Sequence, residues 1–511
     1  MTMSSKRMKA LAVLGTGSDV GKSLIVTGLC RLLFRKGVRV APFKAQNMAL
    51  NSFVTLDGGE IGRAQALQAQ ACGIEPTVDM NPILLKPESD SRSQVVVKGK
   101  VYEALDALAY FERKETLFNI VRDCYERLAS EYECVVIEGA GSAAEINLRD
   151  RDIVNWPVVE LADASVLLVA DIDRGGVFAQ IIGTLDLLAP QERQCVRGVI
   201  VNKFRGDRRL FDDGVRLLES RTGLPVLGVV PYLRDLRLDQ EDSLDLAHSR
   251  SVQFKPDLTN VAVVLFPRMS NFTDFNVLAA EKDVALRFAA TPEDLQGADV
   301  VILPGSKNSL EDLDYLVASG FPAALESHVE RGGELVGICG GYQMLGQDIA
   351  DPKGLERGGT SRGLGFLDVR TELDAPKICR QVQATSLLHD VELGASVRGY
   401  EIHMGRTSRG AAKPCFRIAA SETLEGSVMS EEGASSKNGR IWGTSIHGLF
   451  DQAGFRRGWV NRARGRKGLL PISSSVSDLV TTQLQTELDR WAEHIGRHLN
   501  MDRIYTLCEG R

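Results

Sequence analysis

The chain has 511 residues, of which 44% are hydrophobic and 25% are charged. These proportions are typical of a folded globular protein, and the length predicts two or three domains. The 61 basic and 67 acidic side chains give a formal net charge of −6. This balance argues against a general affinity for nucleic acid or for an anionic membrane surface.

The nine cysteines are scattered, form no C-x-x-C pair and make no cluster with histidine at zinc-binding spacing. This pattern argues against a structural metal and a disulfide framework, and it is typical of a reducing compartment. No apolar run reaches the ~20 residues that cross a bilayer, and the N-terminal segment lacks the apolar core of a signal peptide. We therefore expect a cytoplasmic protein with no membrane partner.

Short β-branched runs alternate with longer amphipathic segments between residues 10 and 231. This alternation predicts βαβ units around a mostly parallel, doubly wound sheet. We assign residues 1–235 to this α/β domain, and residues 236–258, which are rich in Asp, Arg, Ser and Gln, to a linker. The expected strands are Ala10–Leu14, Val38–Ala41, Cys134–Ile137, Ser165–Val169, Gly198–Val201 and Val226–Val229.

The same alternation begins again after the linker, which predicts a second doubly wound, mostly parallel α/β domain over residues 259–460. Residues 461–511 are expected to form a short C-terminal helical tail, because apolar residues recur there at helical spacing. The expected strands of the second domain are Val261–Leu265, Val300–Leu303, Leu335–Ile338 and Gly439–Ile446.

A glycine-rich loop at residues 15–23 follows the first predicted strand and precedes a predicted helix, which is the context of a phosphate-binding loop. Glycines let backbone N–H groups approach an anion, a lysine adds charge for the outer phosphates, and a serine hydroxyl can bind Mg²⁺. The loop departs from the strict G-x-x-x-x-G-K-[ST] pattern, because Thr16 takes the first position. The candidate phosphate-binding residues are Gly17, Gly21, Lys22 and Ser23.

This variant loop resembles that of the dethiobiotin-synthetase-like P-loop proteins, which attach phosphate to a carboxylate. The resemblance implies that Glu138, at the end of an apolar strand, is a Mg²⁺ ligand together with Ser23. It also implies that Asn202 contacts the adenine of ATP. Asp57 is a weaker candidate for a further metal ligand, and a role in an ordinary turn remains an equal alternative for it.

Cys339 lies where a predicted strand turns sharply into a helix, in the sequence Gly-Ile-Cys-Gly-Gly. Such a turn exposes the sulfur at the positive end of a helix, which favours the thiolate. The surrounding glycines, including Gly340, allow backbone N–H groups to approach a developing oxyanion. A thiolate nucleophile needs a base, and His447 follows a strand in a suitable context. His403 is the competing candidate.

The Cys339 turn, the Gly305 loop and the segment around His447 together resemble a class I, triad-type glutamine amidotransferase domain. The resemblance implies that Cys339 attacks the glutamine amide, that His447 transfers protons, and that Gly305 and Gly340 serve glutamine and the oxyanion. The usual His-Pro-Glu ending is absent, because Gly448, Leu449 and Phe450 follow the histidine. The sequence leaves the third triad member open, with Glu401 and Asp451 as candidates.

Residues 42–52, 60–65, 80–87 and 400–405 resemble the cobyrinate-amidating enzymes, which join these two kinds of domain. The resemblance extends from Lys9 to about Leu507 and implies ATP- and glutamine-dependent amidation, with Mg²⁺, of the b, d, e and g carboxylates of adenosylcobyrinic acid a,c-diamide. Cobalt enters only as part of this corrinoid substrate, and the oligomeric state stays open. The candidate contacts of the acidic corrin arms are Lys44, Gln46, Asn47, Arg63 and Lys86, for each of which a solvated surface position is the alternative.

Two other functions remain open at this point. The first is that of the related enzyme that forms the a,c-diamide itself. That enzyme has the same two-domain arrangement but amidates different carboxylates. The second is a regulatory P-loop ATPase whose second domain only binds a ligand. That function would account for Lys22 and Glu138 but not for the reactive setting of Cys339.

Overall fold

The first domain is built on a six-stranded sheet in the order β12-β11-β10-β1-β9-β2, whose strands are all parallel. Each predicted strand overlaps one of these strands. The computed structural model describes residues 8–88, 92–234, 236–238, 252–388, 395–419, 429–472 and 479–510. The strands are β1 (Leu11–Gly15), β2 (Val40–Phe43), β9 (Cys134–Glu138), β10 (Ser165–Asp171), β11 (Val196–Phe204) and β12 (Val226–Pro231).

Helices cover both faces of this sheet, because alternate side chains of each buried strand point to opposite sides. In β1, Leu11 and Val13 join one apolar cluster, whereas Ala12 and Leu14 join the other. The first cluster is closed by α1 (Lys22–Arg35), α2 (Arg63–Ala71), α15 (Leu479–His498) and α16 (Met501–Cys508). The second is closed by α4 (Lys114–Glu131), α5 (Trp156–Ala162), α6 (Val177–Leu187) and α8 (Asp212–Thr222).

An insert between β2 and β9 adds strands that the sequence analysis did not predict. It contains a four-stranded sheet in the order β3-β6-β7-β8 and a separate β4–β5 hairpin. The hairpin reaches the second domain, where β4 contacts β22 and β23. The insert strands are β3 (Gln46–Met48), β4 (Ser52–Val54), β5 (Glu60–Gly62), β6 (Ile83–Pro87), β7 (Arg92–Val97) and β8 (Lys100–Asp106).

The second domain has its own six-stranded sheet in the order β15-β13-β16-β18-β28-β27, and β27 alone runs antiparallel within it. Two mostly parallel sheets flanked by helices confirm the predicted fold class. The strands are β13 (Thr259–Val264), β15 (Val284–Ala289), β16 (Val300–Leu303), β18 (Glu334–Ile338), β27 (Ala434–Ser435) and β28 (Ile441–Thr444). The main helices are α11 (Ser309–Ala318), α12 (Phe321–Glu330), α13 (Gly340–Met344) and α14 (Ala453–Arg466).

Antiparallel strands extend this domain on the side of the first one. A five-stranded sheet runs in the order β26-β25-β22-β23-β29 and places His447 beside Tyr400. Its strands are β22 (Ile378–Ser386), β23 (Ser396–His403), β25 (Phe416–Ile418), β26 (Ser430–Glu432) and β29 (Ile446–His447). A four-stranded mixed sheet, in which only β19 and β21 pair in parallel, contains β19 (Asp348–Asp351), β20 (Gly359–Arg362), β21 (Val369–Glu372) and β24 (Arg406–Arg409).

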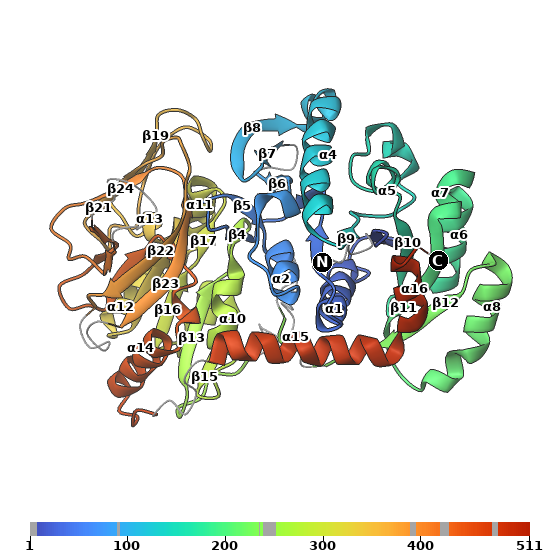
Figure 1. The fold of residues 1–511 in the computed structure, drawn as a ribbon. Helices are drawn as coiled ribbons and strands as arrows, with labels where there is room; N and C mark the ends of the chain where they lie inside the picture. Colours follow the sequence, from blue (N-terminus) through green and yellow to red (C-terminus); the bar gives the residue numbers. More distant parts are fainter. Residues whose placement is uncertain are drawn as a thin grey trace, which may run out of the picture.

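The chain returns to the first domain at its C-terminal end. Helix α14 lies with the second domain and runs through residue 460, where the sequence analysis set a boundary. Helix α15 then crosses beneath the molecule along α1, and α16 follows it (Figure 1). Leu488, Trp491 and Ile495 of α15 are buried against the first sheet. Most of the predicted linker, residues 239–251, lies outside the described residues.

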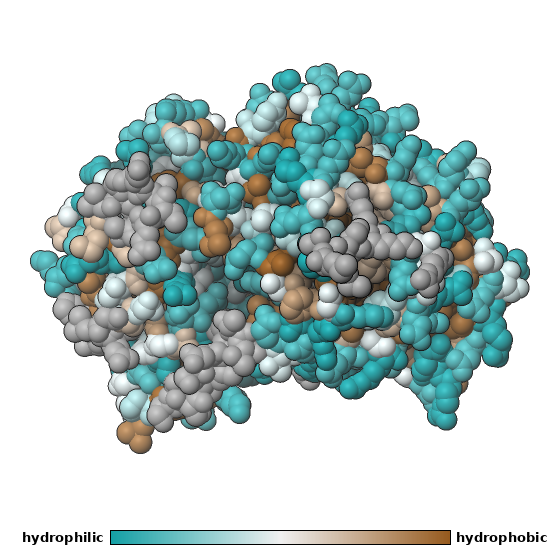
Figure 2. All heavy atoms as spheres, viewed as in Figure 1, coloured by the Kyte–Doolittle hydropathy of each residue, from teal (hydrophilic) through white to brown (hydrophobic). Residues whose placement is uncertain are grey.

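The face of the molecule drawn in Figure 2 is mostly hydrophilic, and its apolar residues show as small, separate areas. The large apolar side chains are instead concentrated in the cores beneath the sheets. Across the described ranges, no helix is both long enough and apolar enough to span a bilayer.

Candidate active sites

A cavity of about 2240 Å³ lies between the domains. Its walls come from the phosphate loop and the insert of the first domain, from residues 272–288 of the second domain, and from α15. The carboxyl ends of parallel strands β1 and β9 open into this cavity, which is where ligands bind in open α/β sheets. The cavity is large enough for both a nucleotide and a second ligand.

The loop at residues 15–23 wraps around the N-terminus of α1. Gly21 adopts a φ of 94°, and a Cβ there would meet the Asn202 side chain at 2.2 Å, so both conformation and space require glycine. The Lys22 ammonium donates hydrogen bonds of 2.9 Å to the carbonyls of Gly17 and Gly141. The charge of Lys22 is thus held inside the loop, next to the place where phosphates would lie.

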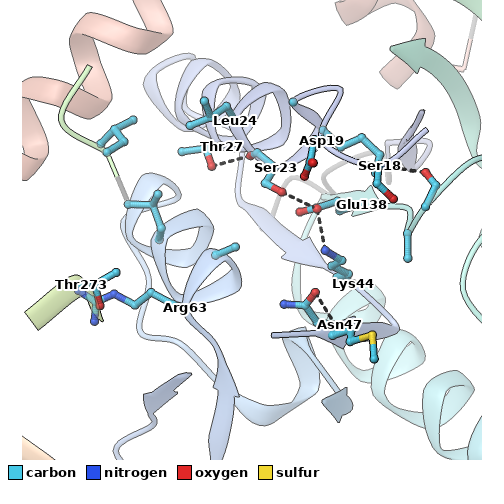
Figure 3. Close-up of a pocket in the computed structure, with 18 of the residues that line it drawn as sticks. Ser18, Asp19, Ser23, Leu24, Thr27, Lys44, Asn47, Arg63, Glu138 and Thr273 are labelled. Atoms are coloured by element: carbon cyan, nitrogen blue, oxygen red, sulfur yellow. Dashed lines mark hydrogen bonds and ion pairs between the residues drawn. The ribbon is translucent and has the colours of Figure 1, made fainter. Parts of the chain in front are cut away.

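Glu138 is fully buried at the end of β9 and collects several donors (Figure 3). The Ser23 hydroxyl donates to its Oε1 at 2.7 Å, and the Lys44 ammonium lies 2.9 Å from the same atom. The Gln68 amide donates to the other carboxylate oxygen. The structure therefore brings together Ser23, Glu138 and Lys44, which the sequence analysis had assigned to the metal and the substrate.

This donor set fits a Mg²⁺ ion. Hydroxyl and carboxylate oxygens are the ligands that Mg²⁺ prefers, and neighbouring ligands of an octahedral ion lie about 3 Å apart. Ser23 Oγ and Glu138 Oε1 are 2.7 Å apart and can therefore hold one ion together. The Lys44 ammonium shares Oε1 with Ser23 and supplies the positive charge beside Glu138.

Asn202 lies at the end of β11, against the phosphate loop. Its amide donates to the carbonyl of Val20 at 2.9 Å, and its side chain lines the cavity. Lys203, the next residue, pairs with buried Asp171 at 3.0 Å. This arrangement leaves Asn202 at the cavity wall, in contact with the loop that would hold the phosphates.

Two predicted site residues are not where the sequence analysis put them. Asp57 lies in the turn between β4 and β5, where Gly58 approaches the carbonyl of Cys379, and it does not line the cavity that holds Ser23 and Glu138. The structure therefore places Asp57 in the turn, which was its equal alternative, and not beside Ser23 and Glu138. The Thr55 hydroxyl caps its carboxylate within the turn.

Lys86 is the second correction, because it is buried in an ion-pair cluster and does not line the cavity. Its ammonium lies 2.6 Å from Glu60 and 2.9 Å from the Ser52 hydroxyl, and Lys377 of the second domain pairs with the other oxygen of Glu60. Burial lowers the pKa of Lys86 to about 8, against the opposing effect of Glu60. The structure therefore places Lys86 in the contact between the domains and not at the cavity wall.

The other predicted substrate residues do line the cavity: Lys44, Gln46, Asn47 and Arg63. Asn47 is buried and donates to Gln65 at 3.0 Å, and Gln46 accepts a hydrogen bond from Tyr110. Arg63 stands at the start of α2 and extends toward Thr273 of the second domain (Figure 3). A ligand in the cavity would therefore contact both domains.

Cys339 occupies a strained turn between β18 and α13 in the second domain. Its φ of 51° is left-handed, which is unusual for a residue other than glycine and is typical of a nucleophile elbow. Gly341 makes the turn possible, since a Cβ there would lie 2.0 Å from the carbonyl oxygen of Leu303. The Cys339 thiol is 6% exposed, and its sulfur lies 3.7 Å from the carbonyl of Ile402.

His447 is the base that the structure places with this thiol, and Asp274 orients it. Nδ1 of the fully buried His447 lies 2.7 Å from Oδ2 of Asp274, whose other oxygen accepts the Gly448 N–H at 3.0 Å. Of the residues that the sequence analysis considered for this role, Glu401 pairs with Arg380 and lies 4.0 Å from His403, and Asp451 lines the cavity between the domains. The predicted pair is therefore a triad of Cys339, His447 and Asp274.

The charges of the triad shift two pKa values in opposite directions. Burial opposes a positive charge on His447, but Asp274 and Cys339 raise its pKa to about 10. Burial also opposes a thiolate on Cys339. The hydrogen bond with His447 and the positive charge of the His447 imidazolium nevertheless lower the pKa of the thiol below its usual value. The arrangement favours a thiolate–imidazolium pair near neutral pH.

Gly305 and Gly340 lie beside the triad, as the resemblance implied. A Cβ on Gly305 would be 3.0 Å from Cε1 of His447, and one on Gly340 would be 2.9 Å from the backbone nitrogen of Ser306. The two loops thus approach each other at backbone level next to Cys339, where N–H groups can stabilise an oxyanion. The competing base, His403, lies 4.0 Å from Glu401. Burial would lower the pKa of His403, but Glu401 and Cys339 raise it above its usual value.

Comparisons with known proteins agree with this division of the chain. Residues 11–245 match the family model described as the CobQ/CobB/MinD/ParA nucleotide binding domain. Residues 260–455 match that of the CobB/CobQ-like glutamine amidotransferase domain. The fold and the two sites define the chain as an enzyme that joins a nucleotide-binding domain to a glutamine amidotransferase domain.

Curated relatives then give the family. A cobyric acid synthase from Syntrophobacter fumaroxidans is 47% identical over 506 residues, and one from Klebsiella pneumoniae strain 342 is 49% identical over 505 residues. A cobyric acid synthase from Dehalococcoides mccartyi strain CBDB1 is 45% identical over 504 residues, and each comparison covers 98% of both chains. The chain belongs to the cobyric acid synthase family, which confirms the resemblance drawn from its motifs.

Proposed function

We propose that this enzyme amidates the b, d, e and g carboxylates of adenosylcobyrinic acid a,c-diamide to give adenosylcobyric acid, using ATP and glutamine. The observation that supports this most directly is the pairing of two complete sites in one chain. One site has the phosphate loop with Ser23 and Glu138, and the other has the triad of Cys339, His447 and Asp274.

The first site would activate the carboxylate. A carboxylate oxygen of the corrinoid attacks the γ-phosphorus of ATP, and the bond between this phosphorus and the β-phosphate oxygen breaks. ADP is the leaving group, and the product is an acyl phosphate. Lys22 holds positive charge at the phosphates, and Ser23 and Glu138 would hold Mg²⁺. A bound Mg²⁺ supplies charge neutralisation for the transferring phosphoryl group.

The second site would supply ammonia. The Cys339 thiolate attacks the glutamine side-chain carbonyl, and His447 protonates the departing nitrogen, which is released as ammonia. The remaining thioester between Cys339 and the glutamyl group is then hydrolysed by water to glutamate. Asp274 holds His447 by Nδ1, so that Nε2, which is buried and has no other partner among the described residues, is directed to this proton transfer. Ammonia then attacks the acyl phosphate, and phosphate leaves as the amide forms.

The cavity suits an acidic, largely apolar macrocycle. Apolar side chains of the second domain, including Val277, Leu286 and Phe288, line the cavity together with the phosphate loop. Cationic side chains from the first domain line the same cavity, and they can pair with the carboxylate arms of a corrin. They include Lys44, Arg63, Arg92, Arg149, Arg151 and Arg205.

Mass spectrometry of the corrinoid tests the proposal. The enzyme is incubated with adenosylcobyrinic acid a,c-diamide, ATP, Mg²⁺ and glutamine, and each amidation changes the mass by one fixed step. Up to four steps are expected. An unchanged a,c-diamide, with amidation of the unamidated acid instead, would identify the a,c-diamide-forming reaction. ATP hydrolysis without amidation of either corrinoid would contradict the synthetase function and favour a regulatory ATPase.

A further inference from the structure

Two asparagines join the domains beside the glutaminase triad. Asn51 of the first domain accepts a hydrogen bond from the Phe272 N–H at 3.1 Å, and Asn271 of the second domain accepts one from the Ser52 N–H at 2.9 Å. Both asparagine side chains are buried. The two bonds form a reciprocal amide clamp, in which each domain's side chain holds the other domain's backbone.

The clamp ends on the turn that carries Asp274. Asn271 adopts a left-handed φ of 53° and begins the short helix Phe272–Phe275, which contains Asp274. Asp274 in turn holds Nδ1 of His447. Two bonds from the first domain therefore hold the Asn271 side chain and the Phe272 backbone, three and two residues before the carboxylate that orients the catalytic base.

The same segment of the first domain also reaches the other side of His447. Tyr400 stacks on the imidazole, with ring centroids 5.4 Å apart and planes inclined by 19°. The hydroxyl of this buried tyrosine donates to the carbonyl of Ser52 at 3.3 Å. Asp274 thus constrains His447 in the ring plane, Tyr400 constrains it from the face, and both are tied to residues 51–52.

We propose that Asn51 and Asn271 are positioning residues for glutamine hydrolysis, through which the synthetase domain holds His447 in register with Cys339. The inference rests on the proposed glutaminase role of the triad. Misplacing a catalytic group by about 1 Å costs ~100-fold in rate. A first-domain segment that fixes the triad therefore makes the glutaminase dependent on its docked partner domain.

Asn271→Gly is the main test, because glycine accepts the left-handed backbone while the amide is lost. We expect the glutaminase kcat to fall at least tenfold with little change in KM, and ammonia-dependent amidation to stay within twofold of the parent. Asn271→Asp keeps the Oδ1 acceptor and should restore most of the activity. Asn51→Ala and Asn51→Asp should repeat this pair of results from the other side of the clamp.

Alkylation of Cys339 by iodoacetamide gives a readout that needs no glutamine. In Asn271→Gly the apparent pKa of the thiol should rise, because the imidazolium is no longer held beside the sulfur. Lys377→Met is the matched control: it breaks a contact with Glu60 in the same hairpin but touches neither Asp274 nor Tyr400. It should leave both the kcat and the alkylation profile as in the parent.

Three outcomes would overturn the proposal. The first is an Asn271→Gly enzyme with the parental kcat and alkylation profile. The second is an equal loss of ammonia-dependent amidation, which would mark a general folding defect. The third is an equal effect of Lys377→Met. Failure of the proposed function would look different, since the parent itself would then release no ammonia from glutamine. The alkylation profiles could still be compared between the parent and the clamp variants.

Discussion

Nδ1 of His447 lies 2.7 Å from Oδ2 of Asp274, although 173 residues separate the two in the chain. The carboxylate fixes the imidazole by one nitrogen and the following backbone N–H by its other oxygen. This double contact takes the place of the glutamate that ends the usual class I triad, and it comes from a turn next to the domain interface. The base of the glutaminase is therefore oriented from outside its own strand.

Replacing Asp274 by Asn should lower the glutaminase kcat by about 10²- to 10⁴-fold, because an amide cannot stabilise the imidazolium or select its tautomer. The measurement is glutamate release from glutamine at saturating substrate. Glu401→Gln serves as the comparison, since the Glu401 carboxylate pairs with Arg380 and lies 4.0 Å from His403, and it should remain close to the parent. Equal losses in both variants would remove Asp274 from the triad.

Cys339→Ala should abolish glutamine-dependent amidation and leave ammonia-dependent amidation in place, because the synthetase site keeps all its residues. The two nitrogen sources are compared by mass spectrometry of the corrinoid at high ammonium concentration and slightly alkaline pH. A loss of both activities would contradict the separation of ammonia release from carboxylate activation.

The alkylation of Cys339 should show a pKa below the usual value of a cysteine thiol. Burial opposes the thiolate, but the hydrogen bond and charge of His447 lower the pKa of the thiol, whereas the pKa of His447 is raised to about 10. In His447→Gln the two largest effects that oppose burial are lost, so the apparent pKa should rise and the rate at pH 7 should fall. Unchanged pH profiles in the two proteins would show that His447 does not carry the charge that stabilises the thiolate.

Lys22→Ala should stop amidation with either glutamine or ammonia, by at least about 100-fold, because the phosphates lose their fixed positive charge. Glutamate release by Cys339 is measured in the same preparation as a check on folding. Retained amidation would exclude the phosphate loop from carboxylate activation.

Asp312 should make the stability of the second domain depend on pH. Burial raises the pKa of this carboxyl to about 6, although Ser306 and the Arg268 N–H donate to it. A raised pKa means that its stabilising effect is complete below the unfolded pKa, near 4, and is lost as the pH rises through about 6.

Asp312→Asn removes this dependence, because an amide stays neutral and the Ser306 hydroxyl can accept from its nitrogen. Relative to the parent, the variant should gain stability between pH 4 and 7 by up to about 3 kcal/mol. The difference in Tm between the two proteins, followed across this range, measures the effect. A difference that does not change with pH would contradict the raised pKa.

The sequence predicted the features whose signal is local. Buried parallel strands appear in the sequence as apolar runs. The glycine-rich loops around Gly21 and Cys339 each contain their functional residues within a few neighbouring positions. The structure places Lys22, Ser23 and Glu138 together because β1 and β9 are adjacent in the sheet. Parallel pairing brings residues at the carboxyl ends of neighbouring strands to one edge, which a sequence pattern can anticipate.

The features that sequence reasoning missed depend on contacts between distant segments. Asp274 had no neighbouring pattern that marked it, and only its place beside an Asn in a left-handed turn could have drawn attention to it. Lys86 was expected at a ligand because acidic corrin arms would attract lysines, whereas Glu60 and Ser52 hold it in the interface. Strands β3, β4 and β5 of the insert were missed because each has only three residues, too few to show an alternating pattern.

The path of α15 and α16 means that the first domain is discontinuous in the chain. Its apolar face beside α1 is closed by Leu488, Trp491, Ile504 and Cys508, which follow the whole glutaminase domain. During synthesis on the ribosome, this half of the core therefore stays incomplete until the glutaminase domain and the helices after it have emerged. The domain that begins first is completed last, so separating the two activities into two polypeptides would require more than one cut.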